Sequence, residues 1–332
     1  MTDLQPIDAS IVIVSFNTRD ILRECLQSVY RETTGLTIEI ILVDNDSKDG
    51  SYDMVASEFP DVHLIQSGAN LGFGAANNLA IEHARGRYIV LLNSDAFLHP
   101  NALQLGLRHM DETPNCGLSG GLLVGRDGER QPSARTFHSL HGDMIVYTGL
   151  AGKYPKSKFF GDFDRTWADP YEAAEVDWVP GAFCIIRPEV LAKVGGLFDP
   201  IFFFYYDEVD LCLRIKKAGY TVWYWPDVVV THIGGESSRT LKSLEFSSKA
   251  AQIVGWRMRS TLMYYRKHHG GLRAWMAKWM EIALYSAVAM KNRNSPDPER
   301  KEKAKRNETL ARLMKQAWAD TNGGRVSPPR PW

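Results

Sequence analysis

The stretch IVIVSFN, from Ile11 to Asn17, decides the fold class of this sequence. A continuous run of branched apolar residues that ends in polar ones is typical of a strand buried in a parallel sheet and leading into a loop. The pattern returns in IEIILVDNDS, from Ile38 to Ser47, and in RYIVLLNSD, from Arg87 to Asp95. VHLIQ, from Val62 to Gln66, is a shorter segment of the same kind. Each of these segments is therefore predicted to be a strand.

In the segments between these strands, apolar residues recur at the spacing of a helix. Asp20 to Tyr30 sets apolar residues on one side, and Ala75 to Ala84 forms a helix before the last of the strands. Strands that alternate with helices predict an α/β fold with a mostly parallel sheet, in which ligands bind beyond the carboxyl ends of the strands. The polar residues at those ends are Ser15 to Asn17, Asp44 to Asp46, Asn70 to Asn78, and Asn93 to Asp95.

Composition bounds the class of protein. The chain has 332 residues, 44% of them hydrophobic, which suits one large domain with an appendage or two domains. Four scattered cysteines without CxxC spacing favour a reducing, cytoplasmic setting over a zinc knuckle or a disulfide framework. The first residues carry no secretory signal pattern, and no uncharged run reaches the length of a membrane-spanning helix.

The formal net charge of zero hides a division of charge along the chain. Residues from Leu241 onward include 19 basic and 7 acidic residues, a net charge of +12. Residues 1–240 include 20 basic and 32 acidic residues, a net charge of −12. A basic tail on an acidic body predicts that the tail meets an anionic surface. Because no nucleic-acid recognition motif accompanies the basic residues, we expect a membrane and no nucleic acid.

Two classes of nucleotide-binding protein fit this sequence poorly. GFGAAN, from Gly72 to Asn77, almost matches the glycine-rich dinucleotide fingerprint, but it follows the third strand and has Asn77 in place of the last glycine. A dinucleotide-dependent oxidoreductase is therefore disfavoured. The GxxxxGKS/T phosphate loop is missing from the sequence, so the chain is not expected to be a P-loop NTPase.

Seven ordered segments resemble glycosyltransferase family 2, and within it the bacterial rhamnosyltransferase-like branch: VSFN, VDNDSKDGS, NLGFGAANN, LLNSDA, VDWVPGAFCIIRPEVL, GGLFDPIFFFYYDEVDLCLR and THIGGESS. The resemblance covers about Ile11 to Ser238. It implies a GT-A fold, a Rossmann-like and mostly parallel sheet flanked by helices, for residues 1–238. A basic, amphipathic helical region is expected at 239–332. The resemblance also implies a nucleotide-sugar donor, a divalent metal ion and inverting transfer by a single displacement.

The resemblance also implies a metal site at two strand ends. A departing nucleoside diphosphate needs a hard cation, Mg²⁺ or Mn²⁺, which prefers carboxylate oxygens and, for Mn²⁺, accepts imidazole. Asp95 stands where the family's DxD motif ends, with Asn93 in place of the first aspartate. His232 resembles the family's second metal ligand. The alternatives are a turn or helix N-cap for Asp95 and a structural role for His232.

The donor pocket follows from the same resemblance. Asp44 resembles the aspartate that accepts hydrogen bonds from the donor's base, with Ser15 and Phe16 lining the same pocket. An Asx-turn within DNDSKDGS is the alternative for this region. Asn77 and Asn78 flank the glycine loop, and they either face the nucleoside or cap local backbone.

The segment VDWVPGAFC contains Trp178 and Gly181, and in the family it helps to form the sugar and acceptor cleft. Stacking of Trp178 on a sugar ring and simple core packing both fit a large aromatic among apolar neighbours. Arg135, in QPSARTFHS, is a candidate partner for a phosphate of the donor or of a lipid acceptor.

The acidic residues that follow an aromatic run in FFFYYDEVDLCLR are interpreted as the catalytic corner. We expect Phe202 to Tyr206 to form a strand and Asp207 to cap the next helix, with Asp210 and Arg214 paired at i and i+4. Inverting transfer needs a carboxylate that takes the proton from the acceptor hydroxyl. Glu208 resembles the family's catalytic base. Asp207 remains the alternative because the family's usual Glu-Asp order is reversed here.

The C-terminal region predicts helices at 247–268, 272–291 and 297–321. In the second of these, an apolar stripe fits either packing against the body or a helix that lies in a membrane interface. The residues of the stripe are Trp275, Met276, Trp279, Met280, Ala283, Leu284 and Ala287. We expect peripheral attachment to the inner face of the cell membrane through these helices, because the tail is also strongly basic.

These features predict a metal-dependent, inverting glycosyltransferase. The resemblance to the rhamnosyltransferase-like branch, and nothing else in the sequence, implies that the sugar is L-rhamnose from a dTDP donor. The expected acceptor is a cell-surface polysaccharide or its lipid-linked glycan precursor. A donor with a UDP-linked hexose or galactofuranose remains an alternative, as does a catalytically silent sugar-binding module on the same fold.

Overall fold

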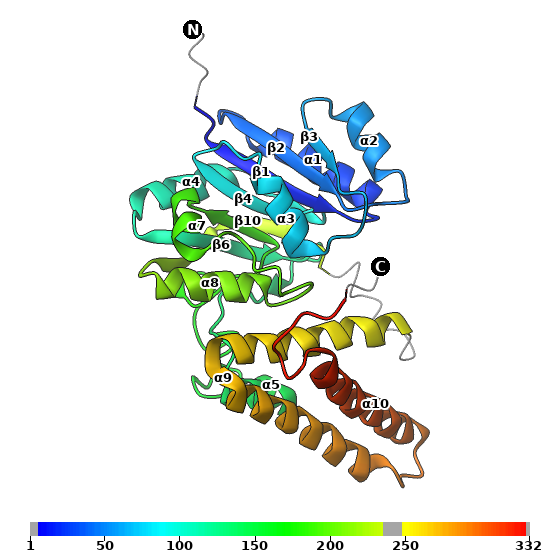
Figure 1. Ribbon diagram of the computed structural model, residues 1–332. Coiled ribbons are helices and arrows are strands. Elements are labelled where there is room, and N and C mark those ends of the chain that lie inside the picture. The colour runs from blue at the N-terminus through cyan, green and yellow to red at the C-terminus, as the bar shows by residue number, and fades with distance from the viewer. Residues whose placement is uncertain (1–5, 235–247, 330–332) are drawn as a thin grey trace.

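A computed structural model describes residues 6–234 and 248–329 of the chain. It shows a twisted sheet covered by helices, above a layer of long C-terminal helices (Figure 1). The strands are β1 (Ala9–Ser15), β2 (Ile38–Asp44), β3 (His63–Gln66), β4 (Tyr88–Asn93), β5 (Ala96–Leu98), β6 (Cys116–Val124), β7 (Arg130–Gln131), β8 (Ala174–Val176), β9 (Phe183–Ile186) and β10 (Thr221–His232). The helices are α1 (Arg19–Glu32), α2 (Ser51–Glu58), α3 (Phe73–Ile81), α4 (Ala102–Glu112), α5 (Leu140–Thr148), α6 (Leu150–Lys153), α7 (Pro188–Val194), α8 (Asp207–Lys217), α9 (Ser248–Asn292) and α10 (Pro298–Asp320).

The main path of the sheet runs in the order β3-β2-β1-β4-β9-β6-β10-β5. β1 is parallel to both of its neighbours, so that Ser15 pairs with Asp44 on one side and Val14 with Asn93 on the other. β9 and β5 are antiparallel to the strands beside them. The predicted α/β fold with a mostly parallel sheet and a C-terminal helical extension is confirmed. Its geometry brings the carboxyl ends of β1, β2 and β4 to one edge.

The aromatic run after α7 is not a strand, so that prediction was wrong. Residues 202–206 form a loop, and Tyr205 and Tyr206 have left-handed backbone conformations, with φ of 67° and 71°. The aromatic rings pack against α9: the ring centroid of Phe203 lies 4.6 Å from that of Trp256. A strand would turn alternate rings away from this helix. The aromatic run therefore docks the C-terminal layer onto the body.

The start of α8 differs by one position from the prediction. Tyr206 is the N-cap residue, and Asp207 is the first residue within the helix. The N-cap side chain makes no capping hydrogen bond. Asp207, Glu208 and Asp210 all lie in the first turn, where negative charge interacts favourably with the helix dipole.

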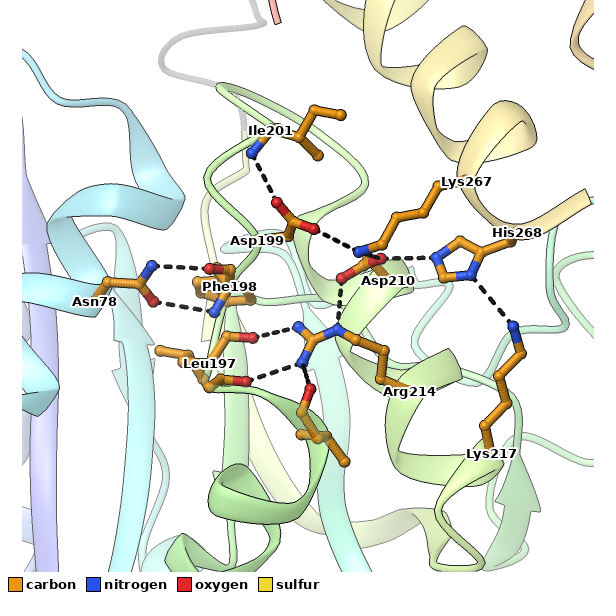
Figure 2. Close-up of polar contacts among 12 residues, drawn as sticks. Asn78, Leu197, Phe198, Asp199, Ile201, Asp210, Arg214, Lys217, Lys267 and His268 are labelled. Carbon is orange, nitrogen blue, oxygen red and sulfur yellow. Dashed lines mark hydrogen bonds and ion pairs between the residues drawn. The ribbon is translucent and has the colours of Figure 1, made fainter. Parts of the chain in front are cut away.

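Asp210 connects α8 to the C-terminal helices (Figure 2). Its carboxylate is fully buried and lies 2.7 Å from Nε of Arg214, so the predicted ion pair is confirmed. The other oxygen contacts Nε2 of His268, at 2.7 Å, and Nζ of Lys267, both from α9. Arg214 also donates to the carbonyl oxygens of Val194, Gly196 and Leu197. One buried acid thus holds three basic side chains from two helices.

The C-terminal helices agree closely with those predicted, although the first two are joined in α9 and separated by a non-helical Gly270 at φ 84°. α10 packs back against α9 around a small apolar cluster that includes Met258, Leu262 and Met314. α5, from the body, packs on α9 as well. The predicted boundary at residues 238 and 239 lies outside the described residues. In the part that the structure describes, no helix is both long and apolar enough to span a bilayer.

Candidate active site

The carboxyl end of β2 presents a buried carboxylate with an unused oxygen. Asp44 has no exposed surface, and its Oδ2 accepts a hydrogen bond of 3.0 Å from the backbone of Ser47. This contact is the Asx-type turn that was named as the alternative for this region. Oδ1 of Asp44 has no hydrogen-bond partner among the residues that the structure describes. Because buried polar atoms are rarely left unpaired, this oxygen is suited to accept a hydrogen bond from a ligand such as a nucleobase.

The end of β1 lies beside Asp44 and carries two further predicted pocket residues. The hydroxyl of Ser15 is 3.1 Å from that of Thr18, which donates to Ser94 over 3.1 Å. Thr18, which was not predicted, thus links the ends of β1 and β4. Phe16 has 45% of its surface exposed, so its ring is available at the mouth of this region.

Asp95 and His232 lie side by side because β5 and β10 pair in antiparallel register, with His232 opposite Ala96. Nε2 of His232 is 3.5 Å from Oδ1 of Asp95. Nδ1 of the same ring is 2.8 Å from Oε1 of Gln131, in β7, whose amide nitrogen donates to the backbone oxygen of His232. Gln131 therefore fixes the ring so that Nε2 presents its lone pair towards Asp95.

This donor set fits one divalent cation that also has ligands from a substrate. Metal bonds to oxygen and imidazole nitrogen of about 2.0–2.2 Å allow two ligand atoms 3.5 Å apart to share one ion. Burial lowers the pKa of His232, although the charge of Asp95 opposes this, so the neutral imidazole is favoured. Among the described residues, no group of three or more His, Cys, Asp or Glu side chains could hold a metal by itself. Diphosphate oxygens are the natural source of the missing ligands.

The two acids of the predicted catalytic corner, Asp207 and Glu208, have different environments. Asp207 is 1% exposed, and its Oδ1 faces the first turn of α3 so closely that a Cβ on Gly74 would lie 2.5 Å away. Burial, and then the charge of Glu208, raise the pKa of Asp207 well above its ordinary value. Asp207 is therefore suited to remain a neutral acid. Glu208 is half-buried and lies against Gly181. A Cβ added to Gly181 would be 3.8 Å from the Cβ of Glu208.

Glu208 lies near two basic side chains that sequence reasoning largely missed. Burial raises the pKa of Glu208, while electrostatic interactions with Arg135 and His138 oppose that rise. Nδ1 of His138 is 2.8 Å from Oδ1 of Asp143, and Asp143 also accepts a hydrogen bond of 2.6 Å from Tyr265 in α9. No local motif marks His138 or Asp143. Their place beside the site depends on the contact of Asp143 with Tyr265, which forms where α5 packs on α9. Arg135 was named only as a candidate phosphate ligand.

Gly181 connects the two halves of the site. The next residue, Ala182, accepts a backbone hydrogen bond of 2.9 Å from Asn93, at the end of β4. Asn93 in turn has its side-chain nitrogen 3.5 Å from Nε2 of His232. A continuous path of contacts therefore leads from Glu208, through the 181–182 turn, to the pair of Asp95 and His232.

Three residues predicted to bind the donor are occupied within the protein. Asn77 donates to the backbone oxygen of Phe73, and Asn78 exchanges two hydrogen bonds with the backbone of Phe198 (Figure 2). Trp178 is 4% exposed, with its indole nitrogen bonded to the carbonyl of Thr136. These contacts correspond to the structural alternatives, backbone capping and core packing. Donor binding by these three side chains stays a prediction, and the contacts above show that each of them also has a structural role.

Comparison with known proteins relates the chain to glycosyltransferases. Residues 10–171 match the family model for Glycosyl transferase family 2. The chain is 27% identical to N-acetylglucosaminyl-diphospho-decaprenol L-rhamnosyltransferase of Mycobacterium tuberculosis, with 88% of this chain and 92% of that protein covered. Rhamnosyltransferase WbbL of Escherichia coli is also 27% identical, over 76% of this chain and 91% of that protein. The fold is similar to a mannosyltransferase of Pyrobaculum calidifontis in complex with GDP-Man and Mn²⁺, with a TM-score of 0.53, 16% identity and coverage of 96% and 90%.

Proposed function

Because the chain is a rhamnosyltransferase-like protein of glycosyl transferase family 2, we propose that it transfers L-rhamnose from dTDP-rhamnose, with inversion, to a lipid-linked glycan. A nucleotide-sugar glycosyltransferase is what the family and the relatives support directly. The M. tuberculosis relative is named for an acceptor on a decaprenyl diphosphate, and this supports a lipid-linked acceptor here. Such an acceptor places the enzyme at the cytoplasmic face of the membrane.

The observation that carries this proposal is the contact path from Glu208 to Asp95 and His232. A bound divalent cation, Mg²⁺ or Mn²⁺, supplies charge neutralisation for the departing diphosphate. Asp95 and His232 are the residues that would hold it. The free Oδ1 of Asp44 accepts a hydrogen bond from the base of the donor. Glu208, on the other side of the 181–182 turn, takes the proton from the acceptor hydroxyl as its oxygen attacks the anomeric carbon.

A screen of nucleotide sugars tests both the class of reaction and the donor. Purified protein is titrated calorimetrically with dTDP-rhamnose and with UDP-linked hexoses and galactofuranose, with and without Mn²⁺ or Mg²⁺, and donor hydrolysis is followed in parallel. We expect metal-dependent binding and hydrolysis, strongest for dTDP-rhamnose. A preference for a UDP-sugar would contradict the proposed donor, dTDP-rhamnose, and would leave the proposed glycosyl transfer unchanged. Binding without any hydrolysis or transfer would identify a catalytically silent module.

The metal assignment predicts a graded series of variants. Asp95→Ala and His232→Ala each remove a proposed ligand, so metal-dependent donor binding should be lost. Gln131→Ala removes only the group that orients the imidazole, and it should weaken metal affinity roughly 10- to 100-fold. Mn²⁺ binding, measured by electron paramagnetic resonance in the presence of the nucleoside diphosphate, reports the affinity. The exposed Asp20→Ala serves as the control, and wild-type Mn²⁺ affinity in His232→Ala would remove this residue from the site.

A further inference from the structure

The second half of α9 exposes an apolar stripe along its length. Within residues 271–292, the exposed apolar side chains recur at spacings of three and four residues, which is one face of a helix. They are Leu272, Trp275, Met276, Trp279, Ala283, Ala287 and Met290. The exposure is large for such side chains, reaching 71% for Leu272 and 72% for Met290. Five of these residues belong to the stripe predicted from the sequence, and for them packing against the body is wrong. The other two residues of the predicted stripe, Met280 and Leu284, are partly buried. From here on, the stripe means the seven exposed residues.

The opposite face of the same segment is already occupied. Ala274, Ala277, Ile282 and Ala289 are buried. Glu281, also on this side, is 1% exposed and is held by Arg257 and by the hydroxyl of Tyr147 from α5. The helix is thus fixed to α5 and to the rest of the C-terminal layer, so the exposed stripe is presented on a rigid support.

The exposed charges of the segment 270–293 all have one sign. Glu281 is the sole acidic residue in this stretch of the sequence, and its carboxylate is 1% exposed and paired with Arg257. Arg273, Lys278 and Lys291 belong to the same segment. Lys278 lies over the ring of Trp279, with its Nζ 4.7 Å from the ring centroid. A tryptophan-containing apolar face bordered by basic residues is the composition of helices that lie in a membrane interface.

We propose that the stripe, defined as the seven exposed residues above, rests in the headgroup region of a bilayer that contains anionic lipids. From Leu272 to Met290 the helix extends roughly 27 Å at 1.5 Å per residue, long enough to lie flat as an anchor. The apolar side chains enter the interface, and the neighbouring basic residues contact lipid phosphates. A second copy of the chain is a poorer occupant, because it would bring two sets of like charges together.

Vesicle flotation tests this surface without any sugar donor. The full-length protein is mixed with phosphatidylcholine vesicles or with vesicles that also contain phosphatidylglycerol. We expect recovery only with the anionic vesicles. The paired change Trp275→Ser and Trp279→Ser should weaken partitioning roughly tenfold or more, since each side chain loses buried apolar area. The paired change Arg273→Gln and Lys291→Gln should weaken it by a similar factor and reduce the dependence on anionic lipid.

The matched control replaces two exposed aromatics in the body, Phe159→Ser and Tyr171→Ser, which are 59% and 66% exposed. This control should float like the unmodified protein. If the paired tryptophan variant floats with anionic vesicles as well as the unmodified protein does, the proposal is wrong. It is also wrong if sedimentation shows a dimer of the unmodified protein and the same variant is a monomer. Flotation needs no catalysis, and donor hydrolysis needs no membrane. A failure of the membrane proposal can therefore be distinguished from a failure of the proposed function.

Discussion

Replacing Glu208 with glutamine is expected to lower the rate of sugar transfer roughly 10²- to 10⁴-fold, the usual contribution of a general base, while donor binding is retained. The amide keeps the shape of the side chain but cannot accept the proton of the acceptor hydroxyl. Transfer to acceptor is measured under saturating donor, and donor affinity is measured calorimetrically on the same preparation. The proposed metal ligands are unchanged in this variant, so donor affinity isolates the effect on chemistry.

Asp207→Asn is the matched control for that result. Asp207 is buried against α3, and its raised pKa favours the neutral acid, which asparagine resembles in shape and charge. We therefore expect most of the transfer activity to remain. A reversal of the two outcomes, with Glu208→Gln active and Asp207→Asn inactive, would move the base to Asp207.

The pH profile provides a second check on the same base. Burial raises the pKa of Glu208, so its carboxylate is protonated at a higher pH than that of an exposed glutamate. A protonated base cannot accept a proton. The rate of transfer in the unmodified enzyme should therefore decrease as the pH is lowered through this raised pKa, and the residual rate of Glu208→Gln should not show that step.

The sheet and its polar edge could be predicted because their signals are local. IVIVSFN needs no distant partner to be recognised as a buried strand, and parallel pairing then places Ser15 beside Asp44. The proximity of Asp95 and His232 is different in kind. It depends on the antiparallel pairing of β5 with β10, and only the family resemblance predicted it.

The failed predictions share a physical cause, which is competition between partners that the sequence does not rank. The aromatic run has strand-like composition, but α9 offers apolar surface on one side, and the loop serves that helix instead. Donor binding by Asn77 and Asn78 stays a prediction, and it faces the same competition, because their side-chain nitrogens already donate to carbonyl oxygens within the protein. The stripe on α9 has the period of a packed helix, and only the packing of α5 and α10 determines which face remains free.

Replacing Asp210 with asparagine is expected to destabilise the protein by about 3–5 kcal/mol, the range found when one partner of a buried ion pair is removed. Asp210 has no exposed side-chain surface and contacts Arg214, Lys267 and His268 (Figure 2). Asparagine removes the buried charge that Arg214 and His268 share, and Lys267 keeps only its contact with Asp199, at 2.7 Å. The shift in the urea midpoint, followed by circular dichroism, measures the loss.

The destabilisation should depend on pH in a defined direction. Burial alone raises the pKa of Asp210, but the hydrogen bond from His268 and the charges of Arg214 and Lys267 hold it at about 2. The pKa is thus lower in the folded protein than the value of about 3.9 expected in the unfolded chain. A depressed acid pKa contributes stability that is complete above pH 4 and is lost as the pH falls towards 2. The gap between the two proteins should therefore narrow below pH 4.

Asp20→Asn is the matched control for this prediction, because Asp20 also contacts two arginines but has a side chain that is 69% exposed. Ion pairs in so exposed a setting contribute little to stability, so its urea midpoint should hardly move. Equal midpoint shifts for the two variants would contradict a special role for burial. A large shift for Asp210→Asn that persists undiminished at low pH would assign the loss to packing and not to the charge. The combination of a large shift at neutral pH and a small one at low pH is what a buried carboxylate joining α8 to α9 requires.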